Sequence, residues 1–90
     1  MFGGSLTIET DRLVAANDRS RQEIVASLER LRAQLAELMG ELRAAVSAGN
    51  LAAAERLEAI AAGVAAQLQE VQNLNRETQL QNVHYRASAR

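Results

Sequence analysis

A seam of large aliphatic residues runs through the first half of this 90-residue chain. Its members are spaced alternately four and three residues apart: Ile24, Leu28, Leu31, Leu35, Leu38 and Leu42. Such steps average about 3.5 residues, so one apolar stripe faces a partner helix along the whole length of a coiled coil. The pattern therefore predicts a long helix that packs against another helix.

The composition favours an all-α protein stabilised by helix packing. Aromatic residues make up 2% of the chain, Trp, Pro and Cys are absent, and Ala, Leu, Arg, Glu and Gln dominate, which are strong helix formers. Without cysteine there is no disulfide framework and no thiolate ligand. A chain of this length encloses only a small core of its own, so we expect help from another chain.

We expect one helical-hairpin domain over residues 10–90, preceded by a flexible arm over residues 1–9 that contains two glycines. The first helix is predicted at about 11–46, because Thr10 or Asp11 can cap its start and nothing interrupts it before Val46. A start at Ser20 is the alternative, since Ser20 and Glu23 have capping-box spacing.

The predicted turn is the segment 47–50. Gly49 can adopt the left-handed conformation that ends a helix, and Asn50 can cap the next one. The second helix is expected at about 51–84, followed by a frayed tail, and its alanines leave room for the leucine seam opposite. Its thinner apolar stripe is interrupted by Gln67, Thr78 and Gln81 and consists of Leu57, Ile60, Val64, Val71, Leu74 and finally Tyr85. The result is an antiparallel two-helix hairpin.

Towards the N-terminus the seam becomes polar and its register is ambiguous. A strict heptad continues through Arg21, Asn17 and Val14, whereas a slip of one residue gives Ser20, Asn17 and Leu13. Asn17 could set register and oligomeric state as a buried polar residue, or it could be half-exposed and merely tolerated. Gly40 and Gly63 lie inside the helices, where they either permit close helix approach or are simply tolerated.

An isolated hairpin would leave a long strip of Leu and Val in water, so we expect it to pair with a second hairpin as a four-helix bundle. The second hairpin can be the same chain or a different one, giving a homodimer or a heterodimer. The residues predicted to carry the interface are Ile24, Leu28, Leu31, Leu35, Leu38, Leu42, Leu57, Ile60, Val64, Val71 and Leu74.

Several function classes are disfavoured. The single His and the absent Cys offer no catalytic or metal-binding constellation, and the glycines form no phosphate-binding loop, so we expect no enzyme and no cofactor. Ten arginines balance eleven acidic residues without forming a basic stripe, which argues against nucleic-acid binding. No segment is apolar enough to insert into a membrane, and the first ten residues do not resemble a Sec-type signal peptide.

The layout resembles the WXG/ESAT-like family of small helical hairpins. The resemblance lies in the polar arm, Ile8-x-x-Asp11-x-Leu13, the long helix, the turn ending in Gly49, the Ala-rich start of the second helix and Tyr85. The family's Trp-x-Gly turn motif corresponds to Ser47-Ala48-Gly49, which keeps the Gly and lacks the Trp. Its Tyr-x-x-x-Asp/Glu export signal corresponds to Tyr85–Ala89, which has Ala in the acidic position.

The resemblance implies a dimeric four-helix bundle that leaves the cell folded, without a signal peptide, through a type VII secretion system. On this hypothesis the chain is a partner, adaptor or chaperone of another exported protein, and Tyr85 belongs to a degenerate export signal. The alternative is a cytoplasmic coiled-coil adaptor or structural protein unrelated to secretion. A helical-hairpin filament subunit ranks third, and a membrane-surface role ranks last because the polar faces mix both signs of charge.

Overall fold

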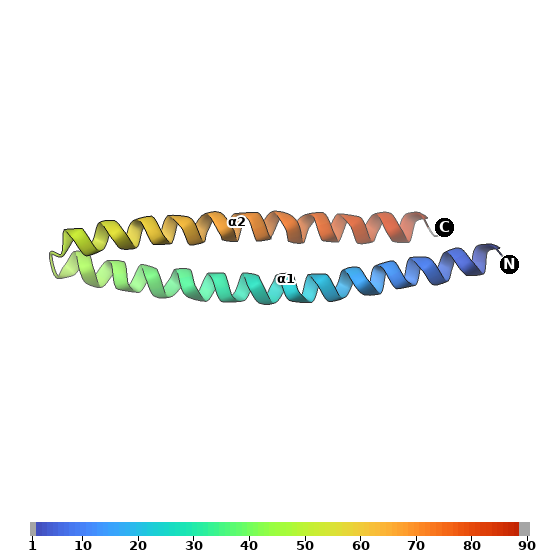
Figure 1. Ribbon diagram of the computed structural model, residues 1–90, viewed down its shortest axis with the longest axis horizontal. Coiled ribbons are helices and arrows are strands. Elements are labelled where there is room, and N and C mark those ends of the chain that lie inside the picture. Colours follow the sequence, from blue (N-terminus) through green and yellow to red (C-terminus); the bar gives the residue numbers. More distant parts are fainter. Residues whose placement is uncertain (1, 89–90) are drawn as a thin grey trace.

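The computed structural model describes the backbone of residues 2–88 and the side chains of residues 8–87. This part of the chain forms two helices, α1 (Phe2–Ser47) and α2 (Leu51–Ser88), and no strand. The helices lie side by side and antiparallel, with the turn at one end and the start of α1 near the end of α2 at the other (Figure 1). The helical hairpin predicted from the sequence is confirmed.

The hairpin is a long, thin rod. Its extents are 72 × 14 × 12 Å and its radius of gyration is 20.2 Å, whereas a compact domain of this length has a radius of gyration of about 12 Å. A pair of helices has only one line of contact, so each helix turns most of its surface towards solvent. Among the described residues only four apolar residues are buried, each still 5–7% exposed: Leu28, Ala54, Ala61 and Val64.

The contact line is a pair of unbroken heptad seams. On each helix every seam residue is buried or half-buried. The seam of α1 consists of Thr10, Val14, Asn17, Arg21, Ile24, Leu28, Leu31, Leu35, Leu38, Leu42 and Ala45. The seam of α2 consists of Ala54, Leu57, Ala61, Val64, Leu68, Val71, Asn75, Thr78, Asn82 and Tyr85. The strict heptad therefore continues to the N-terminal side of Ile24, and Leu13 and Ser20, which the slipped register required, are exposed.

On α2 the observed seam differs from the predicted stripe in every second position. Leu57, Val64 and Val71 lie in the contact line as expected, but Ile60 is 52% exposed and Leu74 is 48% exposed. The predicted stripe would have buried Gln67 and Gln81 together with these two residues. The observed register instead places Leu68 and two small alanines opposite the leucines of α1, and it puts the amides of Asn75 and Asn82 in the contact line in place of those of Gln67 and Gln81.

Both helices are longer than predicted. α1 begins at Phe2, so residues 2–9 are helical where a flexible arm was expected, and the helix does not start at Ser20. α2 continues to Ser88 rather than ending near residue 84. Extending an existing helix adds a hydrogen bond for each residue fixed and avoids the cost of nucleation. The long helix α1 can therefore include Gly3 and Gly4, although each destabilises it by about 1 kcal/mol.

The turn joins a C-terminal glycine motif to an asparagine cap. Gly49 has φ +72°, its N–H donates to the Val46 carbonyl at 3.0 Å, and the Asn50 N–H donates to the Ala45 carbonyl at 2.9 Å. This is the Schellman pattern, in which glycine avoids the steric penalty of a left-handed backbone. The Asn50 side-chain oxygen accepts from the Ala53 N–H at 3.2 Å and caps α2.

Candidate interaction surface

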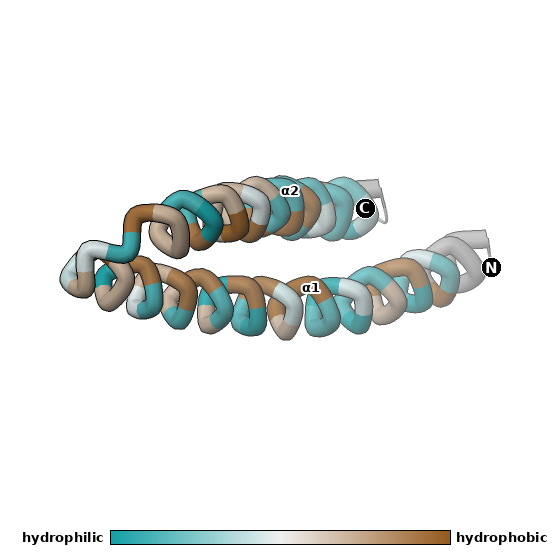
Figure 2. Tube along the Cα trace, turned by 60° about the vertical axis from the view of Figure 1, so that its left-hand side comes forward, coloured by the Kyte–Doolittle hydropathy of each residue, from teal (hydrophilic) through white to brown (hydrophobic). Residues whose placement is uncertain are grey.

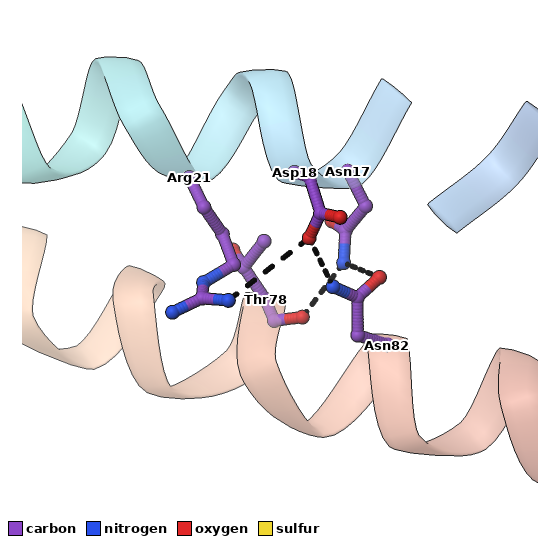
Figure 3. Close-up of polar contacts among 5 residues, drawn as sticks. All are labelled: Asn17, Asp18, Arg21, Thr78 and Asn82. Atoms are coloured by element: carbon purple, nitrogen blue, oxygen red, sulfur yellow. Dashed lines mark hydrogen bonds and ion pairs between the residues drawn. The ribbon is translucent and has the colours of Figure 1, made fainter. Parts of the chain in front are cut away.

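A polar layer joins the two helices at the open end of the hairpin (Figure 3). The Asn17 amide donates to the Thr78 carbonyl at 2.8 Å and to the Asn82 side-chain oxygen at 2.7 Å. The Asn82 amide in turn donates to an Asp18 carboxylate oxygen at 2.6 Å. Asn82 is only 6% exposed, so these contacts satisfy groups that have left water. Asn17 is thus half-exposed, as one of the two interpretations had it, but it is paired with α2 rather than merely tolerated.

Some polar groups of this layer are poorly paired. The Arg21 guanidinium lies 4.0 Å from the Asp18 carboxylate, which is the outer limit of an ion pair. The Arg21 Nε and the Asn75 side-chain oxygen are buried without a hydrogen-bond partner. A buried unpaired polar group costs about 1–3 kcal/mol, so the open end of the hairpin is held less firmly than the aliphatic part nearer the turn.

Figure 2 shows the same gradient along α2, which changes from mainly hydrophobic near the turn to mainly hydrophilic towards its C-terminal end. The hydrophilic end of α2 lies opposite the N-terminal part of α1, where Asn17 and Arg21 occupy the seam in place of leucines. Sequence reasoning identified Asn17 but not its partner Asn82. The observed heptad, continued through Asn75 and Asn82, would have revealed that partner.

Nine of the eleven predicted interface residues lie in the seam between α1 and α2, so they first hold the hairpin together. Leu28 and Val64 are buried there, at 5% and 6% exposure, and have little surface left for another chain. Ile60 and Leu74 are the two that lie outside the seam. The surface that the hairpin leaves open for any further chain therefore lies mainly beside the seam, and several residues there were not singled out from the sequence.

The residues beside the seam form two long faces, one on each side of the plane that contains both helix axes. In heptad terms with the seam at a and d, positions g and c of both helices lie on one side and positions e and b on the other. The grooves agree with this assignment. Two grooves that share Ser27 and Val71 open on the first side, and a groove lined by Asp18, Val25 and Arg86 opens on the second.

We call the first side the acidic face. It carries six glutamates against two arginines, a net charge of −4: Glu9, Glu23, Glu37, Glu41, Glu70 and Glu77 against Arg30 and Arg56. Three large apolar side chains are exposed on it: Leu13, Ile60 and Leu74.

We call the second side the neutral face. It carries five acidic residues against four arginines, a net charge of −1: Asp11, Asp18, Glu29, Glu55 and Glu58 against Arg32, Arg43, Arg76 and Arg86. Six large apolar side chains are exposed on it: Ile8, Val25, Met39, Val46, Leu51 and Val83. The two faces thus differ in both charge and apolar content.

Tyr85, the residue matched to an export signal, occupies the last seam position of α2 and is half-buried there. Its ring lies beside that of His84, with the ring centroids 6.5 Å apart. The position that should be acidic in that signal, Ala89, lies outside the described residues. The structure therefore gives Tyr85 a packing contact at the open end of the hairpin.

Two further features bear on chemistry. Over the described residues, no group of three or more His, Asp or Glu side chains is arranged to hold a metal ion. Within the residues that the structure describes, neither helix contains a stretch long and apolar enough to cross a membrane. In the comparisons with known proteins, no family model, no curated protein and no solved structure matches this chain.

Proposed function

We propose that this protein is a non-catalytic protein–protein interaction module that pairs with a second helical hairpin to form a four-helix bundle. The observation that supports the proposal is the exposure of large apolar side chains along both sides of a rod with a single line of contact. Nine such side chains of the described part are at least 39% exposed, and a tenth, Leu80, is exposed on the outer surface of α2. Bundling a second hairpin onto this surface would remove a long apolar strip from water.

The pairing is tested by the mass and helicity of the purified chain. We expect sedimentation equilibrium to give twice the 9.7 kDa chain mass, or a bundle that forms only when a different hairpin is added. A chain that is monomeric, fully helical and cooperatively unfolding by itself would need no second hairpin, and the proposal would be wrong. Concentration-dependent polymers without a limiting mass would point to a filament instead.

A seam variant tests whether packing of the hairpin underlies the assembly. Leu35→Asp places a carboxylate in the half-buried contact line, where its desolvation is costly, so we expect loss of both helicity and assembly. Ala33→Asp is the matched control, because Ala33 is exposed at the outermost position of the same helix. Unchanged dimerisation of Leu35→Asp would show that this seam does not support the bundle.

We further propose that the module serves type VII secretion, as a partner, adaptor or chaperone of an exported protein. The resemblance to WXG-like hairpins supports this, together with the antiparallel hairpin and its glycine turn. The rival is a cytoplasmic coiled-coil adaptor, which the missing Trp of the turn favours.

Export of the intact chain distinguishes these two roles. The measurement is its amount in the culture medium of the source cell, with a cytoplasmic marker as control and Tyr85→Ala in parallel. Loss of export in Tyr85→Ala would show that the tyrosine is part of the export signal, provided that the variant still assembles. Export that persists would indicate a signal carried by the partner, and complete retention would favour the cytoplasmic adaptor.

A further inference from the structure

The two faces of the hairpin differ in their capacity to meet a copy of themselves. In a symmetric pair each face would lie opposite the same face of the other chain. Helices in bundles lie about 8–10 Å apart, which is about one Debye length at physiological ionic strength, so charges brought together there are not fully screened. Two acidic faces, each with a net charge of −4, would repel one another.

The neutral face lacks this obstacle. Its net charge is −1, and arginines and acidic residues occur on both helices, so a second copy presents groups of both signs to each helix. Charge therefore opposes self-association through one face and permits it through the other.

Apolar content points to the same face. The neutral face exposes twice as many large apolar side chains as the acidic face, six against three. They are distributed along the rod, from Met39, Val46 and Leu51 near the turn, through Val25, to Ile8 and Val83 towards the open end. Val46 is 57% exposed and Leu51 is 70% exposed, so the hairpin itself leaves most of their surface uncovered.

The dimensions of the rod are sufficient for a stable contact. A flat face of 72 by 14 Å covers about 1,000 Å², and a standard interface buries about 800 Å² on each partner. One face can therefore supply a complete interface, and the opposite face then remains on the outside of the bundle.

We propose that a second copy of this chain docks on the neutral face, centred on Val25, Met39 and Val46, and that the acidic face stays open to solvent. The proposal rests on the function proposed above and names its partner and its surface. It also assigns the interface to residues beside the seam, outside the aliphatic repeat that dominates the sequence.

The test compares two matched pairs of substitutions in the full chain. Met39→Glu with Val46→Glu places two carboxylates on the neutral face, and Ile60→Glu with Leu74→Glu places two on the acidic face. We expect wild type and the acidic-face variant to sediment at twice the chain mass and the neutral-face variant to sediment as a monomer. Circular dichroism on the same samples checks that each variant remains helical.

The other outcomes overturn the proposal in distinguishable ways. Dissociation by the acidic-face pair alone would place the contact on the wrong face while leaving bundle formation intact. A monomeric wild type with low helicity would exclude a second copy and require a different hairpin. A monomeric wild type that is stably helical would exclude the bundle itself.

A second measurement avoids any disruption of the fold. Because the chain has no cysteine, Val25→Cys and Leu74→Cys each provide a single site for an environment-sensitive fluorophore, one on each face. As the concentration rises through the range where dimers form, we expect a soluble quencher to lose access to the label at position 25 and to keep access at position 74. Equal access at both positions, or protection at position 74 alone, would contradict the assignment.

Discussion

At the level of single residues, the most specific contacts of the hairpin are polar and lie where its aliphatic seam ends. Asn17 joins α1 to two groups on α2, the Thr78 carbonyl and the Asn82 side chain. Leucines at successive heptad positions pack almost equally well in several registers, whereas paired amides satisfy each other in only one. The polar layer, together with the tight turn at Gly49, therefore favours one alignment of two otherwise repetitive helices.

Loss of the Asn17 side chain should lower the stability of the protein measurably. Asn17→Ala deletes two of the three interhelical hydrogen bonds of the layer and leaves the nearly buried Asn82 oxygen without its donor, so we expect the free energy of unfolding to fall by about 2 kcal/mol. Urea unfolding at fixed protein concentration measures the change. Ser20→Ala, an exposed neighbour, should change it by less than about 0.5 kcal/mol. Equal effects of the two variants would mean that the polar layer does not contribute to stability.

At the level of the helices, Gly40, Gly49 and Gly63 differ in whether the structure requires a residue without a side chain. Gly49 has a left-handed backbone that a side chain would strain, whereas Gly40 and Gly63 are helical and a Cβ added to either would meet no atom within 4 Å. Close approach of α1 and α2 therefore does not require glycine at positions 40 and 63, which disfavours one of the two interpretations of these residues. Gly40 and Gly63 therefore lower the stability of the helices without permitting a closer contact between them.

Replacement by alanine should consequently have opposite effects on stability at Gly49 and at Gly63. We expect Gly49→Ala to lower the free energy of unfolding by about 1 kcal/mol and Gly63→Ala to raise it by about 1 kcal/mol. Thermal and urea unfolding of the two variants, compared at one concentration, test the signs. Gly63 lies on the acidic face, so destabilisation by Gly63→Ala together with loss of the dimer would indicate that a second chain packs there.

The two ends of the hairpin should also differ in local stability. Unpaired buried groups of Arg21 and Asn75 weaken the open end, while the leucine seam and the capped turn stabilise the other. We expect amide hydrogen exchange to be fastest in residues 8–16 and 79–87 and slowest around Leu28 and Val64. Uniform protection along both helices would show that the polar end is as stable as the aliphatic part.

At the level of the whole molecule, the rod is too thin to bury its own apolar surface. Only four apolar residues of the described part are buried, none of them completely, and both faces beside the contact line carry exposed Leu, Ile, Val or Met side chains. The stability of such a chain should rise with the concentration of its partner, just as the stability of a ligand-binding protein rises with the concentration of its ligand. On the proposed function, folding and assembly form one equilibrium.

This coupling predicts that the unfolding temperature rises with protein concentration. We expect a clear upward shift over a hundredfold range of concentration for wild type, and a much smaller shift for the Met39→Glu, Val46→Glu variant. Differential scanning calorimetry at several concentrations provides the measurement. A wild-type transition that does not move with concentration would argue for an autonomous hairpin.

Much of the fold follows from local sequence signals. The aliphatic repeat of α1 predicted a helix packed on another helix, and Gly49 followed by Asn50 indicated where the chain reverses, because few residues favour a left-handed backbone and an adjacent cap. The register of α2 was predicted less well. Two stripes that differ at every second position share Leu57, Val64 and Val71, so periodicity by itself does not choose between Ile60 and Ala61.

The sequence by itself determined that this chain is a two-helix hairpin with a leucine seam, because these features depend on contacts between near neighbours and on the helical period. Only the tertiary structure decided which residues of α2 meet that seam, that Asn17 pairs with Asn82, and that the remaining surface divides into an acidic and a neutral face. The physical reason is that a face of the hairpin combines residues from both helices. Their grouping exists only once the helices are aligned by packing across the contact line.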